Sequence, residues 1–353
     1  MIDDYGGVLT VARVLILGGS WFLGAAVAEL AVQRHEVTTF RRGVTGGSIA
    51  GVATVYGDRA DPAAVARLAA AGPWETVIDT SSYVPRETLA LAEALEPVAG
   101  RYVLISTVSV YKGWPIDALS EFSPILECPP DAGPDYGFDA DPSPSRYGFG
   151  KAGCEQAVID VFGPSRTTIL RPGVILGPRE YVGRLQWWLD RMLRGGRVLA
   201  PGRPDRSIQP VDVRDVAEFA LTPGLTGIMN LVAAGEETMS DMLTACISVT
   251  SAAARLEWIT DEPWLVEQGV RQWTGLPLWR TYPGTWMVDG SRARAAGFQA
   301  RPIAQTVAAT WEWLASGGAA ITHERAAALG ISAPHEQELL HMWDTAQLGF
   351  HRA

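Results

Sequence analysis

A tyrosine and a lysine four residues apart, Tyr147 and Lys151, form the pair of side chains in this sequence that is best suited to proton transfer. They lie at the start of an expected helix over residues 148–162, so both side chains share one face of that helix. A tyrosine with the ordinary pKa of about 10 is a poor acid-base group at neutral pH, but a neighbouring ammonium group stabilises its phenolate form. The pair is suited to moving a proton to or from an alcohol oxygen while a nicotinamide takes or gives hydride.

Three hydroxyl side chains, Ser106, Thr107 and Ser109, follow an expected strand over residues 102–105. They would lie at the carboxyl end of that strand, where open α/β sheets bind their ligands. A hydroxyl group at this edge can hold the same substrate oxygen that Tyr147 protonates. The two features together predict the active site of an oxidoreductase.

The stretch LGGSWFLG joins an expected strand over residues 14–17 to an expected helix over residues 25–32. A glycine-rich turn in this place binds the diphosphate of a dinucleotide cofactor. Gly18 would make the tight turn, and Gly24 would let the helix pack closely on the strand. Trp21 stands where such turns usually carry a further glycine. We expect it at an ordinary negative φ along the edge of the cofactor, where it shields the diphosphate or flanks the 2′-phosphate side.

Arg41 and Arg42 follow a second expected strand, over residues 36–40, at the place where this kind of fold recognises the adenosine ribose. A carboxylate there binds the ribose 2′-hydroxyl of NAD, whereas an arginine suits the 2′-phosphate of NADP. The alternative is that the two arginines form a solvated basic turn. We therefore expect NADP(H) to be favoured over NAD(H).

Asp58 and Arg59 follow a third expected strand, over residues 54–56. From this edge of the sheet they could contact the adenine of the cofactor. Asp58 could instead cap the helix that is expected over residues 62–71.

Short apolar runs alternate with helix-like segments in the first half of the chain, which is typical of a parallel sheet covered by helices on both faces. The predicted fold class is α/β, a doubly wound parallel Rossmann sheet with a smaller C-terminal α/β substrate-binding lobe. We expect a dinucleotide-binding Rossmann domain over residues 1–178, the substrate-binding lobe over 179–316 and a C-terminal extension over 317–353. The expected strands cover residues 14–17, 36–40, 54–56, 76–78, 102–105 and 167–170, and the expected helices cover residues 25–32, 62–71, 86–95, 148–162, 185–193, 239–249 and 335–348.

The composition argues against several classes of protein. A formal charge of −10 without a basic stripe speaks against nucleic-acid binding. The sequence has no apolar window of membrane-spanning length and no signal-peptide pattern, so we expect a soluble cytoplasmic protein with no membrane partner. The three cysteines are odd in number and widely spaced, which predicts reduced thiols and no metal site. The expected partner is a small-molecule substrate, and a homodimer stays open.

These motifs resemble those of the extended and atypical short-chain dehydrogenase/reductase superfamily, the group known as the NAD-dependent epimerase/dehydratase family. The resemblance covers residues 12–315 and rests on LGGSWFLG, ISTVSVY, YGFGK, LRPGVILGP and IQPVDVRDVAEF. It implies Tyr147 as the acid-base group, Lys151 as a ribose ligand that modifies the tyrosine pKa, and Thr107 as the hydroxyl that orients the substrate. The further cofactor contacts that it implies are Gly18, Ser20, Trp21, Phe22, Gly24, Thr80, Ser81, Ser82, Ser106, Pro172, Gly173 and Val174. The substrate contacts that it implies are Tyr83, Ser109, Arg184, Gln209 and Trp279.

Departures from the family pattern narrow the activity. The dehydratase branch carries an Asp-Glu pair after the fifth strand, where this chain has Val108 and Ser109, so dehydration of a sugar nucleotide is not expected. Epimerases that retain NAD usually keep a carboxylate where this chain has Arg41. The favoured hypothesis is an NADP(H)-dependent oxidoreductase that transfers hydride between nicotinamide and a carbonyl or alcohol, with Tyr147 as the acid-base group. The alternatives are an NAD(P)-dependent epimerase or isomerase of a sugar or related metabolite, and a cofactor-bound RNA-binding or sensory protein.

Overall fold

The structure is a computed structural model that describes residues 11–318 and 324–350 of the chain. The chain forms two compact units. Unit 1 contains the described residues up to 174 together with 213–232 and 287–300, and unit 2 contains 175–212, 233–286 and the described residues from 301 onward. The division of the chain after residues 178 and 316, and the substrate-binding role of the second lobe, stay predictions.

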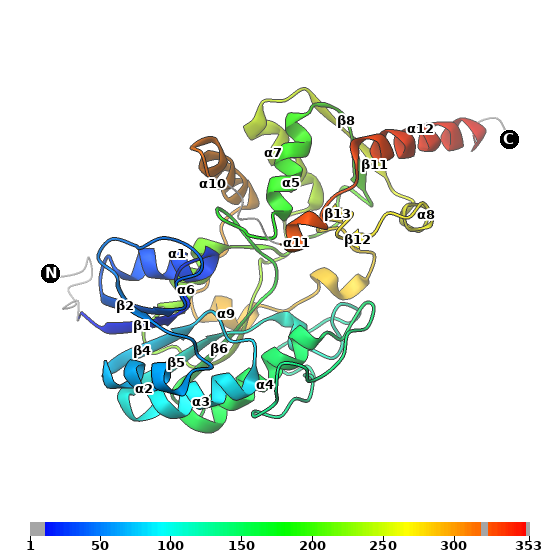
Figure 1. The fold of residues 1–353 in the computed structure, drawn as a ribbon. Helices are drawn as coiled ribbons and strands as arrows, with labels where there is room; N and C mark the ends of the chain where they lie inside the picture. The colour runs from blue at the N-terminus through cyan, green and yellow to red at the C-terminus, as the bar shows by residue number, and fades with distance from the viewer. Residues whose placement is uncertain (1–10, 319–323, 351–353) are drawn as a thin grey trace. The chain divides into compact units, whose positions relative to one another are not determined.

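Unit 1 is built on a seven-stranded parallel sheet (Figure 1). Its strands are β1 (Arg13–Leu17), β2 (Glu36–Arg41), β3 (Ala53–Tyr56), β4 (Trp74–Asp79), β5 (Ala99–Ile105), β6 (Thr167–Pro172) and β10 (Gly227–Leu231). They are arranged in the order β10-β6-β5-β4-β1-β2-β3, so the strand order reverses between β1 and β4. Sheets of this kind bind their ligands at that reversal point, beyond the carboxyl ends of the strands.

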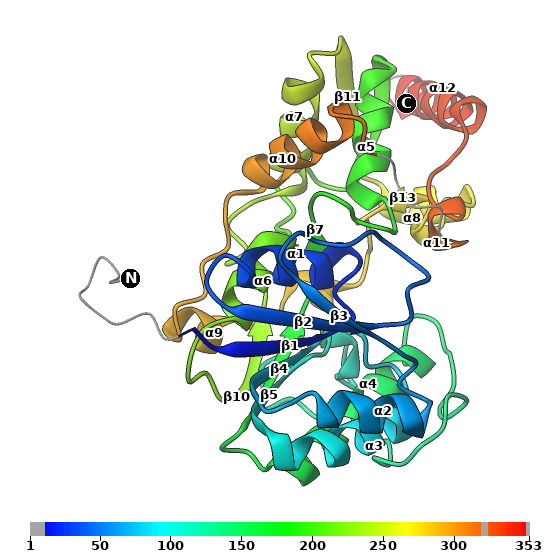
Figure 2. The same cartoon turned by 60° about the vertical axis from the view of Figure 1, so that its left-hand side comes forward.

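Helices cover both faces of this sheet (Figures 1 and 2). They are α1 (Phe22–Ala31), α2 (Pro62–Ala70), α3 (Pro85–Leu95), α4 (Arg146–Phe162), α6 (Val213–Ala220) and α9 (Ser291–Ala295), with two short 3₁₀ helices, η1 (Glu96–Val98) and η2 (Val108–Val110). On one face α3 packs against both α2 and α4, and on the other face α1 packs against α6.

The core of unit 1 fills the space between the sheet and the layer of α2, α3 and α4. Leu15 and Leu104 from the strands and Leu68, Leu91 and Val158 from the helices are fully buried there. Strand β1 is apolar from Val14 to Leu17 and β5 is apolar from Tyr102 to Ile105, because both faces of the sheet are covered. This packing fixes the carboxyl ends of β1, β4 and β5 at one edge, and the candidate site is built on that edge.

Unit 2 combines helices with short pairs of parallel strands. Its helices are α5 (Arg184–Leu193), α7 (Met239–Thr250), α8 (Glu262–Glu267), η3 (Pro283–Trp286), α10 (Ile303–Ala315), α11 (Glu324–Ala327) and α12 (Ala333–Phe350). Its strands are β7 (Ile175–Leu176), β8 (Gly196–Pro201), β9 (Val211–Asp212), β11 (Ala254–Ile259), β12 (Gln272–Trp273) and β13 (Leu276–Pro277). Strand β11 pairs with β8, β7 pairs with β9 and β12 pairs with β13, while α7 packs against α5 and α10.

The α/β Rossmann class predicted from the sequence is confirmed, and all six predicted strands are present. The seventh strand, β10, is not predicted, because its sequence GIMNL contains a glycine and an asparagine, two residue types that are depleted in strands. Helix α1 begins at Phe22, three residues before the predicted start at 25. Within residues 11–318 and 324–350, the structure has no helix with the length and apolar character that a membrane span requires.

Candidate active site

The turn between β1 and α1 has the geometry of a phosphate-binding turn. Gly18 and Gly19 have φ values of +103° and +85°, which glycine adopts without strain. A β carbon on Gly24 would lie 2.6 Å from the Gly19 nitrogen and 2.8 Å from Thr80 Oγ1, so only glycine lets α1 approach the turn this closely. Helix α1 begins without a side-chain cap on its first N–H groups, and such N–H groups bind the diphosphate of a dinucleotide. The residues of this turn therefore fit a dinucleotide cofactor.

Trp21 is the N-cap residue of α1, and its φ of −144° is the ordinary negative value predicted from the sequence. The left-handed conformation lies one residue later, at Phe22, whose φ is +39°. A non-glycine residue held in that region costs on the order of 1–3 kcal/mol. Phe22 is buried, and its packing helps to offset that cost. The contact of Trp21 with the edge of the cofactor stays a prediction.

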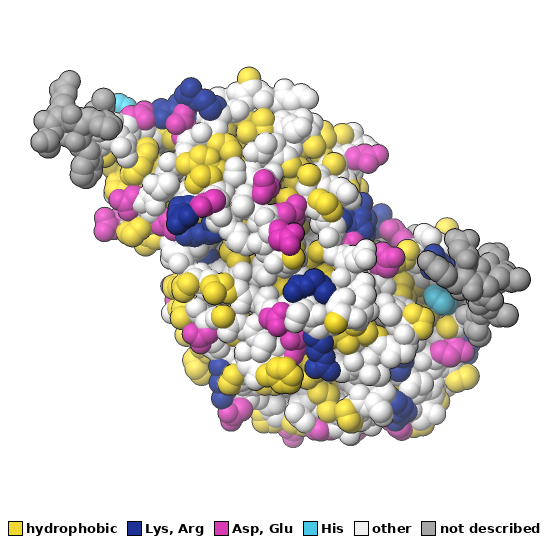
Figure 3. All heavy atoms as spheres, turned by 180° about the vertical axis from the view of Figure 1, so that it is seen from behind, with side chains coloured by type: hydrophobic (Ala, Val, Ile, Leu, Met, Phe, Trp, Pro, Cys, Tyr) yellow, Lys and Arg dark blue, Asp and Glu magenta, His cyan; other side chains and the backbone are white. Residues whose placement is uncertain are grey.

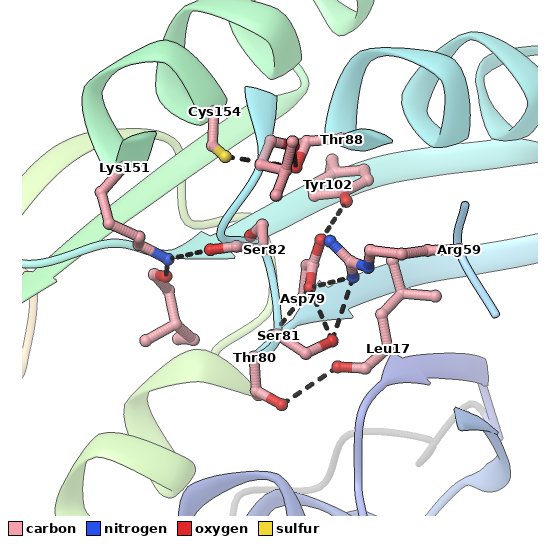
Figure 4. Close-up of polar contacts among 12 residues, drawn as sticks. Leu17, Arg59, Asp79, Thr80, Ser81, Ser82, Thr88, Tyr102, Lys151 and Cys154 are labelled. Atoms are coloured by element: carbon pink, nitrogen blue, oxygen red, sulfur yellow. Dashed lines mark hydrogen bonds and ion pairs between the residues drawn. The ribbon is translucent and has the colours of Figure 1, made fainter. Parts of the chain in front are cut away.

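A buried carboxylate, Asp79, ends strand β4 (Figure 4). Its Oδ1 accepts hydrogen bonds from Arg59 Nη2 and from the Ser81 backbone N–H, both at 2.9 Å. Its Oδ2 accepts a hydrogen bond from the Tyr102 hydroxyl at 2.7 Å. Arg59 Nη2 also donates to Ser81 Oγ at 3.0 Å. These bonds anchor Arg59 at the end of β4 and shape the turn that continues into Ser82.

Asp58, the neighbour of Arg59, does not cap helix α2. Its Oδ1 accepts a hydrogen bond from the Ala60 N–H at 3.0 Å, which closes a local turn. The N-cap of α2 is Asp61, whose side chain accepts from the Ala63 N–H at 3.0 Å. A contact of Asp58 with adenine stays a prediction.

The charge of Asp79 depends on its partners. Burial alone would raise the pKa of this carboxyl group, but the Arg59 guanidinium and the hydrogen bonds from Ser81 and Tyr102 outweigh burial and hold the pKa below its ordinary value. A lowered pKa in the folded state contributes stability at neutral pH, and that contribution is lost as the pH falls through the lowered pKa.

We expect Asp79→Asn to lower the free energy of unfolding at neutral pH by about 1–3 kcal/mol, because the buried Arg59 guanidinium loses its counter-charge while the amide oxygen still accepts one hydrogen bond. The difference from the wild type should shrink below about pH 4, because the protonated carboxyl group resembles an amide. Urea unfolding of both proteins between neutral and acid pH measures this. Asp205→Asn, in an exposed pair with Arg203, is the control and should have little effect. A difference that does not change with pH would contradict the argument.

Lys151, on α4, is nearly fully buried and is held by backbone carbonyl groups at the ends of β4 and β5. Its Nζ donates to the carbonyl oxygen of Ser82 at 2.9 Å and to that of Ile105 (Figure 4). An ammonium group has three N–H donors, so these carbonyl groups use two of them. Burial lowers the pKa of Lys151, against the opposing effect of the nearby carboxylates of Asp79 and Glu155.

Tyr147 lies one turn before Lys151 on α4, and its side chain is 45% exposed. Its ring centroid lies 6.2 Å from that of Tyr83, and Lys151 Nζ lies 5.6 Å from the centroid of the same Tyr83 ring. Tyr83 itself is 55% exposed. The predicted acid-base group Tyr147 and its lysine, Lys151, thus both lie beside the ring of Tyr83, which is itself a predicted substrate contact.

The ends of β5 and β6 place further predicted residues at the same edge of the sheet. Thr107 Oγ1 accepts a hydrogen bond from the Ser109 N–H at 3.2 Å and lies 3.3 Å from Ser109 Oγ, so the two hydroxyl groups are paired. Pro172 is the last residue of β6, and Gly173 and Val174 follow it.

A buried network of polar side chains lies beside Lys151 and is not predicted from the sequence. Glu155, one turn after Lys151 on α4, accepts hydrogen bonds from Arg171 Nε at 2.9 Å and from the Ser106 hydroxyl. Arg171 Nη1 donates to the hydroxyl of Tyr111 at 3.0 Å. The available signal is the spacing Tyr147, Lys151 and Glu155, which puts all three on one helical face, together with a charged residue inside the apolar strand β6.

Arg41, at the end of β2, is turned toward its own part of the chain and is 9% exposed. Its Nη1 donates to the carbonyl oxygen of Gly47 at 2.8 Å, and its guanidinium carbon lies 5.6 Å from the centroid of the Tyr56 ring. Arg42 is exposed. The two arginines therefore have different surroundings, and only Arg42 is solvated.

The predicted substrate contacts of unit 2 each have partners within that unit. Arg184 donates to the buried Glu180 at 2.8 Å and lies 5.6 Å from the Trp273 ring centroid. Gln209 is buried, and its Nε2 donates to the Ala233 carbonyl oxygen at 3.2 Å. Trp279 is 2% exposed, and its Nε1 donates to a carboxylate oxygen of Glu262 at 2.6 Å. Their role in binding a substrate stays a prediction.

Comparison with protein families gives the identity that these features support. Residues 14–223 match the model of the NAD dependent epimerase/dehydratase family. The chain belongs to this family. The match covers the phosphate turn, the Asp79 cluster, the Tyr147 and Lys151 pair and helix α6. Comparison with curated proteins finds no match.

Solved structures with the same fold include epimerases. The Bordetella bronchiseptica enzyme WbmG in complex with NAD has a TM-score of 0.65 at 17% identity, over 88% of this chain and 96% of that chain. UDP-glucose 4-epimerase from Thermotoga maritima with UDP-glucose has a TM-score of 0.64 at 15% identity, over 86% and 99%. UDP-glucose 4-epimerase from Thermus thermophilus in complex with NAD has a TM-score of 0.58 at 20% identity, over 85% and 98%. At these identities the likeness shows the fold alone.

The prediction that NADP(H) is favoured over NAD(H) is wrong. The family is NAD-dependent, and the structures of WbmG and of the Thermus thermophilus epimerase contain NAD. The error came from Arg41, which was expected to bind a 2′-phosphate. In the structure this guanidinium donates to the Gly47 carbonyl oxygen and lies over Tyr56. The residue type at the end of β2 was therefore a misleading guide to the cofactor.

The described residues carry surface charges of both signs, and their cysteines are free. On the face drawn in Figure 3, the Lys and Arg side chains of the described residues alternate with Asp and Glu side chains. No group of three or more His, Cys, Asp and Glu side chains within residues 11–318 and 324–350 could hold a metal ion. Cys128, Cys154 and Cys246 are free thiols, as the sequence predicts.

Proposed function

We propose that the chain is an NAD-dependent epimerase of a nucleotide-linked sugar, with Tyr147 as its acid-base group. Membership of the epimerase/dehydratase family and the arrangement of Tyr147 and Lys151 around the exposed Tyr83 ring support this proposal. NAD, when bound, would supply the acceptor and donor of the hydride that such an epimerisation needs. The protein must hold the cofactor, remove and return one proton, and retain the oxidised sugar while the sugar turns its opposite face to the cofactor.

The residues divide these tasks. Gly18, Gly24 and the first N–H groups of α1 would hold the diphosphate. Lys151, fixed by the Ser82 and Ile105 carbonyl groups, has one N–H donor left for the nicotinamide ribose, and its positive charge favours the phenolate of Tyr147. Tyr147 is exposed enough to reach a substrate hydroxyl, from which it would take a proton and to which it would return one.

A net oxidoreductase is less well supported than an epimerase. The favoured hypothesis from the sequence combined NADP with reduction of a carbonyl, and its cofactor half depended on Arg41. Val108 and Ser109 occupy the places where dehydratases carry an Asp-Glu pair, so the chain lacks the second acid-base pair that water elimination needs. Epimerisation requires no group beyond NAD and one proton carrier, and the described residues supply that carrier.

Unit 2 by itself places two arginines beside one tryptophan. Arg184 and Arg280 both lie against the Trp273 ring, with guanidinium carbons 5.6 Å and 4.7 Å from its centroid. Guanidinium groups bind diphosphates through paired charge-assisted hydrogen bonds, and an aromatic ring beside them can stack on a base. The WbmG structure with NAD and UDP and the epimerase structure with UDP-glucose give the substrate class to test first.

The test is to incubate the purified protein with UDP-glucose and UDP-N-acetylglucosamine and to follow the sugar signals by NMR. We expect an equilibrium mixture of two epimers, no net formation of NADH, and NAD released when the protein is denatured. Stoichiometric consumption or production of reduced cofactor would contradict the proposal and favour a net dehydrogenase or reductase. Deuterium transferred from added labelled cofactor to released product would contradict a closed cycle.

A further inference from the structure

Ser109 lies in the short helix η2, which follows strand β5 at the edge of the sheet where Tyr147 is found. Every residue from 102 to 111 is buried except Ser109, which is partly exposed. The other two hydroxyl side chains after β5, Ser106 and Thr107, are only 3% and 7% exposed. Of the three hydroxyl residues, Ser109 is therefore the one that a substrate can reach.

The hydrogen bonds inside this turn also leave Ser109 as the available donor. Ser106 donates its O–H to Glu155, and Thr107 donates its O–H to Ser109 Oγ at 3.3 Å. Thr107 Oγ1 in turn accepts the Ser109 backbone N–H at 3.2 Å. A hydroxyl group has one O–H donor, and that of Ser109 has no acceptor among the described residues. The Thr107 hydroxyl is thus used to hold Ser109, whose own donor stays available for a ligand.

The first turn of α4 holds Ser109 close to Tyr147. A β carbon on Gly148 would lie 2.4 Å from the Ser109 carbonyl oxygen, so the backbone of η2 touches the backbone of α4 at this point. Gly148 directly follows Tyr147, and its N–H donates to Oγ of the N-cap residue Ser145 at 3.1 Å. A larger residue at position 148 would push the two segments apart. Glycine therefore keeps the backbone of Ser109 beside the residue that is proposed as the acid-base group.

The other end of η2 is fixed by Tyr111, which is fully buried. Its hydroxyl donates to Asn230 Oδ1 at 2.6 Å and accepts from Arg171 Nη1 at 3.0 Å. Its N–H donates to the Val108 carbonyl oxygen at 3.2 Å, which closes the short helix. Because both ends of η2 are held, Ser109 has its place before a substrate arrives. A donor that is preorganised in this way stabilises developing charge without a cost of reorganisation.

We propose that Ser109 donates a hydrogen bond to the substrate oxygen that loses its proton to Tyr147, and that Thr107 is a positioning residue which acts through Ser109. In this step the substrate O–H bond breaks and the Tyr147 O–H bond forms, while Ser109 keeps its own proton. The Ser109 donor stabilises the negative charge that builds up on the substrate oxygen. This role rests on the proposed function, and it gives Ser109 the orienting task that the family resemblance implies for Thr107.

The test uses conservative variants of the two residues. Ser109→Ala removes the proposed donor, Thr107→Val removes the hydroxyl that holds it while keeping the shape of the side chain, and a double variant removes both. Thr107→Ser keeps the hydroxyl. The control is Thr168→Val, because the Thr168 hydroxyl is also buried, in the neighbouring strand β6, and donates to the Leu225 carbonyl oxygen. Steady-state kinetics with the sugar nucleotide that the wild type converts gives kcat and KM, while calorimetry with NAD⁺ and melting temperatures check cofactor binding and folding.

We expect Ser109→Ala to lower kcat by about 10²-fold with little change in KM, the scale of removing one donor to a developing charge. Thr107→Val should lower kcat by about tenfold, the scale of one hydrogen bond. In the Ser109→Ala background, Thr107→Val should have no further effect, because Thr107 then has no hydroxyl to hold. Thr107→Ser and Thr168→Val should both stay near the wild type.

A Thr107→Val loss that exceeds the Ser109→Ala loss, or that multiplies with it in the double variant, would overturn the inference, since Thr107 would then bind the substrate itself. Full turnover of Ser109→Ala would overturn it as well. The proposed function fails separately. A wild-type protein that converts the sugar nucleotide with net formation of NADH contradicts epimerisation, and the same variants then test Ser109 on that oxidation.

Discussion

Tyr147→Phe is expected to reduce kcat by about 10²–10⁴-fold, the usual effect of removing a positioned acid-base group. Only the hydroxyl is lost, because phenylalanine keeps the ring that lies beside Tyr83 on the exposed side of α4. Binding of NAD and of the substrate should change little, so the loss falls on kcat and not on KM. Steady-state kinetics with the substrate identified by NMR measures the effect.

The control for this variant is Tyr136→Phe, which makes the same chemical change at a surface position. Tyr136 is 40% exposed and its hydroxyl donates a long hydrogen bond of 3.4 Å to the Glu127 carbonyl oxygen. Its kcat should equal that of the wild type. If Tyr147→Phe retains full turnover while its cofactor content is unchanged, Tyr147 is not the acid-base group and the proposed mechanism fails.

The sheet of unit 1 could be predicted because its strands carry their own signal. Buried parallel strands such as β1 and β5 contain short apolar runs, and the glycine-rich turn marks the passage from strand to helix. The relative order of Tyr147, Lys151 and Thr107 along the chain then placed them at one edge, since carboxyl ends of parallel strands share an edge. Here local sequence and overall fold point to the same arrangement.

Contacts between distant segments could not be predicted in the same way. Arg41 stands where the sequence suggests an NADP ligand, but the fold of residues 42–52 decides which atoms its guanidinium meets. Arg59 is anchored by Asp79, twenty residues later, while its contact with the adenine stays a prediction. In both cases the residue type was known and its partner was set by tertiary structure.

The buried ion pair of Glu155 and Arg171 is another contact between distant segments that the sequence does not predict, and its loss is expected to cost more stability. The only sequence signals for this pair are the four-residue spacing of Glu155 from Lys151 and the charge of Arg171 inside β6, yet Glu155 and Arg171 are each 2% exposed. Their bidentate pair ties α4 to β6 and, through the Ser106 hydroxyl, to the end of β5. The α4 turn that carries Lys151 is therefore fixed by an ion pair directly behind it.

We expect Glu155→Ala to lower the free energy of unfolding by about 3–5 kcal/mol, because it leaves the buried Arg171 guanidinium without a counter-charge. Denaturant unfolding measures the loss. The control is Glu96→Ala, whose pair with Arg166 is more than one-third exposed on each side and should contribute less than about 1 kcal/mol.

A double variant separates two roles of the Glu155–Arg171 pair, one in folding stability and one in positioning the residues of the active site. Glu155→Leu combined with Arg171→Met replaces the pair by apolar side chains of similar size, and buried pairs replaced in this way often retain or gain stability. We expect the double variant to be more stable than Glu155→Ala but to turn over more slowly than the wild type, because the Ser106 hydroxyl loses its acceptor beside Lys151. Recovered stability with full turnover would show that the pair serves folding only. Lost turnover with a normal fold and normal NAD binding would show that the charge behind Lys151 positions the proton-transfer group.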